Sequence, residues 1–102
     1  MYRRLEKKRS MTQERAEEIG LGALVFLAEE PARLGRFLAE TGLGPEDLRR
    51  EAGSPEMLAA VLGHLLSDES MLLVFTSGGS IDPTEVHAAR TRLGGDSPWD
   101  NM

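Results

Sequence analysis

His64 and Asp68 are the two residues whose types and spacing could together do chemistry. Residues four apart lie on one face of a helix, so the carboxylate of Asp68 could reach the imidazole of His64. A buried pair of this kind can act as a pH switch, as half of a metal site or as a general base. The alternative, which we favour, is an inert, hydrogen-bonded histidine at the edge of the core. A metal site would need two or three further ligands, and the sequence supplies no histidine and cysteine set for them.

No other motif in the sequence supports catalysis or a bound cofactor. A serine nucleophile of the hydrolase type sits in a characteristic elbow motif, which is absent. Gly20 and Gly22 lack the third glycine and the preceding strand of a dinucleotide-binding turn. The loop at residues 77–80 has no lysine for a phosphate and is more simply a connector. The chain has no cysteine, which excludes disulfides and thiolate chemistry. We therefore expect a protein that is not an enzyme and that binds no cofactor or metal.

Residues 37–52 are the part of the chain that best fits DNA binding. They are predicted to form a helix, a glycine-containing turn and a second helix, which is the order of a helix-turn-helix. Arg49 and Arg50 would then contact phosphates. However, the second helix begins with Glu46 and Asp47, at the place where such a motif meets the bases. A DNA-associated regulator with a degenerate helix-turn-helix is therefore the alternative hypothesis, and a helical hairpin that builds the core is favoured.

The charges are divided between a basic N-terminal arm and an acidic remainder. Residues 1–9 carry five basic residues and one acid, a net charge of +4, whereas residues 10–102 carry seven arginines and sixteen acids, a net charge of −9. An acidic body repels the phosphate backbone, so nucleic acid is disfavoured as a partner. The leading hypothesis is a non-enzymatic interaction or regulatory module whose partner is another protein. The candidate contact residues are Arg33, Arg36, Arg49 and Arg50.

The sequence gives no sign of a membrane span. The apolar run at residues 19–28 is far shorter than the roughly 20 residues that a spanning helix needs. It also lacks the position and cleavage pattern of a secretory signal. We therefore expect a cytoplasmic protein, and the oligomeric state cannot be read from the sequence.

Residues 54–66 predict the central helix around which these candidates must be arranged. Ser54 is a typical N-cap, and Pro55 suits the first helical position because its missing N–H is not needed there. After the cap, only Glu56 and His64 are polar, and a helix that is apolar nearly all round is buried. Alanines and Gly63 on one side would let a second helix approach closely.

The other helices are predicted from their start and stop signals. Four prolines stand where a helix would begin, and Gly42 suits a left-handed C-cap. The first helix should start near residues 10–12, with Ser10 and Gln13 as a capping box. Residues 19–28 are apolar on every side and should be buried against the central helix. The sequence thus predicts an all-α fold, a compact bundle of five or six short helices in one domain at residues 10–94, followed by a tail at 95–102.

Three segments in order carry a resemblance to a known family. They are ALVFLAEEPARLGRFLAETGLGPEDLRREA, MLAAVLGHLLSDESMLLVF and IDPTEVHAARTRLGG. Over residues 17–94 the chain resembles a small bacterial family catalogued as domain of unknown function 3572. That family has no assigned activity, cofactor or functional residues. The resemblance therefore implies a compact helical cytoplasmic domain and assigns no role to any residue.

Overall fold

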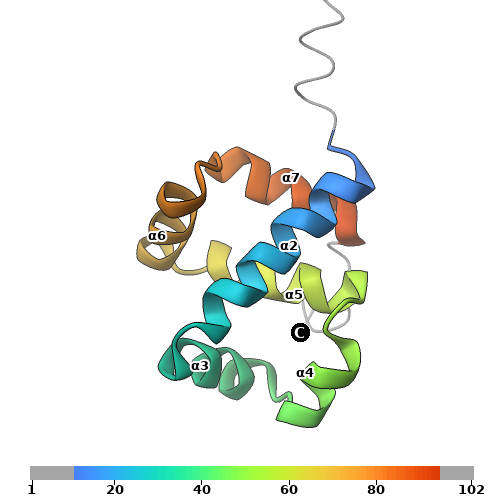
Figure 1. Cartoon of the computed structure of the whole chain (residues 1–102), viewed down its shortest axis with the longest axis vertical. Helices are drawn as coiled ribbons and strands as arrows, with labels where there is room; N and C mark the ends of the chain where they lie inside the picture. Colours follow the sequence, from blue (N-terminus) through green and yellow to red (C-terminus); the bar gives the residue numbers. More distant parts are fainter. Residues whose placement is uncertain (1–10, 95–102) are drawn as a thin grey trace, which may run out of the picture.

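The computed structural model describes residues 11–94, which form six α-helices and no β-strand (Figure 1). The expected all-α class is therefore confirmed. In chain order the helices are α2 (Gln13–Ala28), α3 (Pro31–Thr41), α4 (Pro45–Glu51), α5 (Pro55–Leu66), α6 (Glu69–Gly79) and α7 (Pro83–Gly94). The basic arm at residues 1–9, Ser10 and the tail at 95–102 lie outside the described residues.

Helix α5 lies at the centre of the bundle, as the sequence predicts. The side chain of Ser54 accepts a hydrogen bond of 3.1 Å from the backbone N–H of Met57, and Pro55 opens the helix. Eight of its twelve residues are buried. It packs against α2 and α7, and these three helices supply most of the core (Figure 1). Because other helices enclose α5, its apolar side chains are shielded from water on nearly every side.

Small residues allow both neighbours to come close to α5. A Cβ added to Gly20 of α2 would lie 2.9 Å from the Cβ of Leu58, so the Leu58 side chain packs directly on the α2 backbone there. A Cβ added to Gly63 of α5 would lie 2.9 Å from Nε of Arg90 on α7. At Gly63, which the sequence places on the small side of α5, the close neighbour is therefore the side chain of Arg90, and the tight contact with α2 lies at Gly20.

Helix α2 differs from the sequence prediction at its cap and along its outer face. Thr12 is the N-cap, because its hydroxyl accepts from the N–H of Arg15, whereas the predicted box pairs Gln13 with Ser10, which lies outside the described residues. Ile19, Ala23 and Leu27 are buried, but the outer face of the same apolar run is exposed. That run is therefore not buried on every side, because α5 and α7 cover only one side of it.

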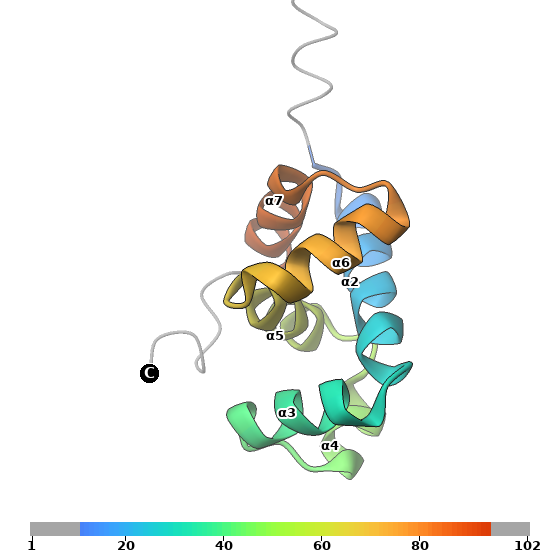
Figure 2. The ribbon, with the colours of Figure 1, turned by 90° about the vertical axis from the view of Figure 1, so that its left-hand side faces the viewer.

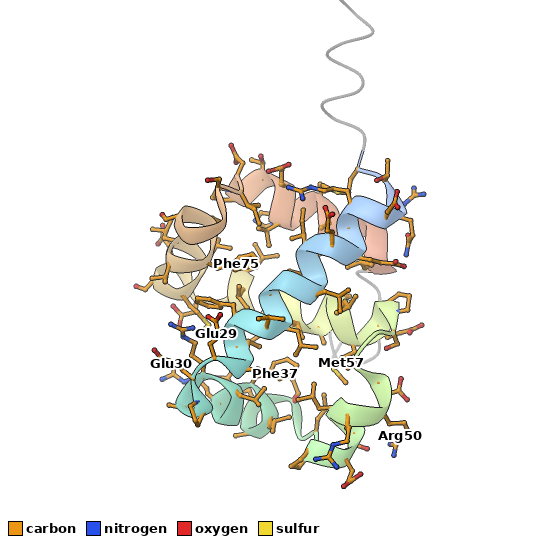
Figure 3. The ribbon with its side chains drawn as sticks, viewed as in Figure 1. Glu29, Glu30, Phe37, Arg50, Met57 and Phe75 are labelled. Carbon is orange, nitrogen blue, oxygen red and sulfur yellow. The ribbon has the colours of Figure 1, made fainter. Side chains whose placement is uncertain are left out.

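Helices α3 and α4 form a hairpin at one end of the molecule (Figure 2). Gly42 ends α3 in the left-handed region with φ of 77°, as predicted. Phe37 is fully buried and points from α3 towards the rest of the bundle (Figure 3). Its ring meets the imidazole of His64 edge to face, with 5.3 Å between the ring centroids. Phe37 is thus the one fully buried side chain of the described hairpin, whose leucines pack against the core in partly buried positions, and α4 has no buried residue.

Candidate functional site

His64 is buried and pairs with a residue far away in the sequence. Its Nδ1 lies 3.1 Å from Oε1 of Glu40 on α3, and only 5% of its side chain is exposed. Its Nε2 is also buried and has no hydrogen-bond partner among residues 11–94. Glu40 thus lies against an imidazole that is almost fully enclosed. This environment favours the structural interpretation of His64.

Asp68 does not reach His64, so the predicted switch pair is wrong. Helix α5 ends at Leu66, and the chain bends by 111° between α5 and α6. Asp68 is the N-cap of α6, where its Oδ1 accepts a hydrogen bond of 3.1 Å from the N–H of Met71. Its Oδ2 lies 3.6 Å from Nη1 of Arg36 on α3. Asp68 thus joins α3 to the start of α6 instead of forming a titrating pair with His64.

Two of the four arginines proposed as contact points, Arg49 and Arg50, are engaged within their own helix. Arg49 pairs with Glu46 at 3.2 Å, and Arg50 pairs with Asp47 at 2.7 Å. Both arginines are exposed, with 75% and 64% of their side chains accessible. Each is therefore partly neutralised by an acid one turn away. Such exposed pairs stabilise a helix only slightly.

Arg33 is not the exposed contact point that the sequence suggests. Its guanidinium lies 3.9 Å from the centre of the Phe26 ring and donates a hydrogen bond of 2.8 Å to the carbonyl oxygen of Phe26. Only 24% of its side chain is exposed. It folds back over the end of α2 because the ring face attracts the cation there. Of the four arginines, Arg36 is the one whose exposed side chain reaches another segment, at Asp68.

A cavity of about 290 Å³ opens between α4 and the start of α5. Its lining is Leu43, Asp47, Arg50, Glu51, Ser54, Glu56 and Met57. The backbone N–H of Gly44 and then the side chain of Arg50 hold the pKa of Asp47 below its ordinary value of 3.8. Among the acids of the cavity, Asp47 is thus used to cap the start of α4. Residues 11–94 contain no group of three or more histidines and acids that could hold a metal ion.

The feature that sequence reasoning missed is a set of large apolar side chains in solvent. Leu21 and Val25 on α2 are 46% and 57% exposed, and Leu73 and Val74 on α6 are 48% and 56% exposed. Leu21 and Val25 lie one turn apart on the side of α2 opposite its core residues. A helical wheel could not separate them from buried neighbours, because the whole run is apolar.

Acidic residues continue the line of these two side chains along α2. Glu14, Glu18, Leu21, Val25 and Glu29 follow one another at intervals of three or four residues and are all exposed. This spacing places them on one face of the helix, which we name the α2 stripe. Glu18 pairs with Arg15 at 2.8 Å. The α2 stripe is thus apolar in the middle and acidic at both ends.

The chain matches one family model, described as "Protein of unknown function (DUF3572)", over residues 13–96. Searches of curated proteins and of solved structures find no significant match. In the part of the chain that the structure describes, no single helix is both long and apolar enough to cross a membrane.

Proposed function

The chain belongs to the DUF3572 family, whose description assigns no activity, and we propose from its structure that it is a non-enzymatic protein–protein interaction module. The observation that carries the proposal is the exposed pair Leu21 and Val25 on α2. Scattered apolar side chains on a surface are ordinary, and our proposal takes the adjacency of these two on one helix face as the sign of a partner's contact surface. We also propose a cytoplasmic location, with which the absence of cysteine is compatible.

An enzymatic role has little support in the geometry. His64 is enclosed and lies against Glu40, and Asp68 is used in capping and in a pair with Arg36. Asp47 and Asp82, whose pKa values are lowered from the ordinary 3.8, both stand at helix starts. Capping explains these lowered values without catalysis.

DNA binding by the α3–α4 hairpin is also not favoured. Helix α4 has seven residues, and its first turn carries Glu46 and Asp47, which would face the bases. Arg49 and Arg50 are paired with those two acids. The local charge would therefore repel the phosphate backbone as much as attract it.

Site-specific photo-crosslinking in cells tests the interaction module. A photoreactive amino acid replaces Val25, and a matched control places it at Thr91, an exposed residue of α7. We expect a discrete adduct with another protein at position 25 and none at position 91. Absence of an adduct at position 25, or equal labelling at both positions, would contradict the proposal.

A further inference from the structure

We infer that the α2 stripe binds an amphipathic helix of another protein that carries basic residues at both ends of its apolar face. The inference rests on the proposed function and adds the chemistry of the partner. Helix α2 lies along the outside of the bundle, with α5 and α7 on its inner side (Figures 1 and 2). The stripe faces away from those helices, so a partner can reach it without any rearrangement.

The apolar middle of the stripe suits a single helix. Leu21 and Val25 are each about half exposed, and a Cβ added to Gly22 beside them would meet nothing nearer than Cε1 of Phe75, at 4.0 Å. Phe26 of α2 and the buried Phe75 of α6 pack against each other beside this face, with their ring centroids 5.5 Å apart. From Glu14 to Glu29 the stripe is about 22 Å long at 1.5 Å per residue, which matches a partner helix of about 15 residues.

The acidic ends of the stripe decide which occupant fits. A second copy of the chain would bring acids against acids whether the two α2 helices run parallel or antiparallel. Nucleic acid and anionic lipid would meet the same negative charge, and residues 11–94 carry seven arginines against fourteen acids. A helix with lysines or arginines at both ends complements Glu14 at one end and Glu29 at the other, while Glu18 is already paired with Arg15. Apolar anchors with basic flanks are therefore the pattern that the stripe selects.

Glu29 is well placed to receive such a flank. It follows the last residue of α2 and lies with Glu30 at the junction with α3, at the edge of the molecule (Figure 3). Glu30 pairs with Arg33 at 3.5 Å, and the same guanidinium lies over the Phe26 ring, so Arg33 is engaged with these two groups. The acidic character of this end therefore remains available to a partner.

Fluorescence anisotropy with two labelled synthetic peptides tests the inference on the full chain. Both peptides are helices of about 15 residues with leucines on one face of their central turns, and one has lysines at both ends of that face where the other has glutamates. We expect the lysine peptide to bind and the glutamate peptide to bind at least about tenfold more weakly. The double variant Leu21→Gln and Val25→Gln should raise Kd for the lysine peptide at least about tenfold. The double variant Glu14→Gln and Glu29→Gln should raise it about two- to fivefold.

A matched control uses the other exposed apolar pair. Leu73→Gln with Val74→Gln removes side chains of the same kind and exposure from α6 and should change Kd less than about twofold. Binding of the lysine peptide that is insensitive to the change at Leu21 and Val25 would overturn the inference, because it would reflect charge alone. A dimer of the wild-type chain that is lost in the Leu21 and Val25 variant would show a second copy to be the occupant and would overturn it too.

Two further outcomes concern the chain's own arm and the relation of this inference to the proposed function. Binding that occurs only after the five basic residues in 1–9 are replaced by glutamine would make the chain's own arm the occupant and overturn the inference. An adduct with another protein at position 25, together with no binding of the lysine peptide, would leave the interaction module standing and refute the basic helix. Failure of both experiments would refute both.

Discussion

Replacing Gly20 by alanine tests the contact that seats α2, and with it the α2 stripe, on the central helix. The new Cβ would lie 2.9 Å from Cβ and 3.3 Å from Cγ and Cδ1 of Leu58. Leu58 is fully buried in α5, and its Cβ is fixed to the backbone. The strain can therefore be relieved only if one helix moves away from the other.

The expected magnitude is the difference of two opposing effects. Overpacking a close core contact costs about 1–3 kcal/mol. Replacing glycine by alanine inside a helix raises the free energy of unfolding by about 0.8–1 kcal/mol, because an alanine chain loses less conformational freedom on folding. Gly20→Ala should thus lower the free energy of unfolding by about 0–2 kcal/mol.

Gly22→Ala is the matched control, two residues away on the same helix. Its Cβ would lie 4.0 Å from Cε1 of Phe75, which is an ordinary contact, so the helix-propensity gain of about 0.5–1 kcal/mol should appear in full. The assay is urea unfolding followed by circular dichroism, with equal m-values required for all three proteins. A gain in stability for Gly20→Ala as large as that for Gly22→Ala would refute the close packing of α2 on α5.

Three other variants probe Phe37, the caps and the stripe. Phe37→Ala should lower the free energy of unfolding by about 3–5 kcal/mol in urea titrations, because Phe37 is fully buried; a loss below about 1 kcal/mol would contradict its place in the core. Asp47 and Asp82 have lowered pKa values in the folded chain, so their stabilising effect is present above the ordinary value of 3.8 and is lost as the pH falls below it. The urea midpoint of the wild type should therefore fall more steeply below about pH 4 than that of Asp47→Asn with Asp82→Asn, and parallel curves would refute this. Leu21→Gln with Val25→Gln should change the free energy of unfolding by less than about 0.5 kcal/mol, and a larger loss would mean that these side chains serve the fold.

The helices could be predicted because residues at or next to their ends carry start and stop signals. Pro31, Pro45, Pro55 and Pro83 each open a helix in the structure, and Gly42 closes one with a positive φ. Such signals act within one turn of chain and need no knowledge of the fold. The burial of α5 could be predicted as well, because a helix without a polar side has no other stable place.

The candidate site could not be predicted, because it depends on which neighbours cover each helix. Asp68 stands four residues after His64, but the helix ends before it and the chain turns, so helical spacing does not apply. The actual partner of His64, Glu40, lies on another helix and leaves no local signature. Arg33 likewise looks free in the sequence and is fixed over Phe26 by tertiary contacts.

The exposure of Leu21 and Val25 could not be predicted from the sequence, for a related reason. Residues 19–28 are apolar on all sides, so periodicity cannot say which side meets the core. Only the positions of α5 and α7 decide it. The acids on the same face, Glu14, Glu18 and Glu29, are visible in the sequence, but they gain meaning only once that face is known to be exposed.

Binding of a basic amphipathic helix is best tested by the sequence of the partner segment that is crosslinked to position 25. After photo-crosslinking in cells, digestion and mass spectrometry of the adduct locate the contact in the partner protein. We expect a helical segment with apolar residues at intervals of three or four and with lysines or arginines at both ends. An acidic or uncharged segment, a segment of this same chain, or no adduct at all would contradict a basic helix as the occupant of the α2 stripe.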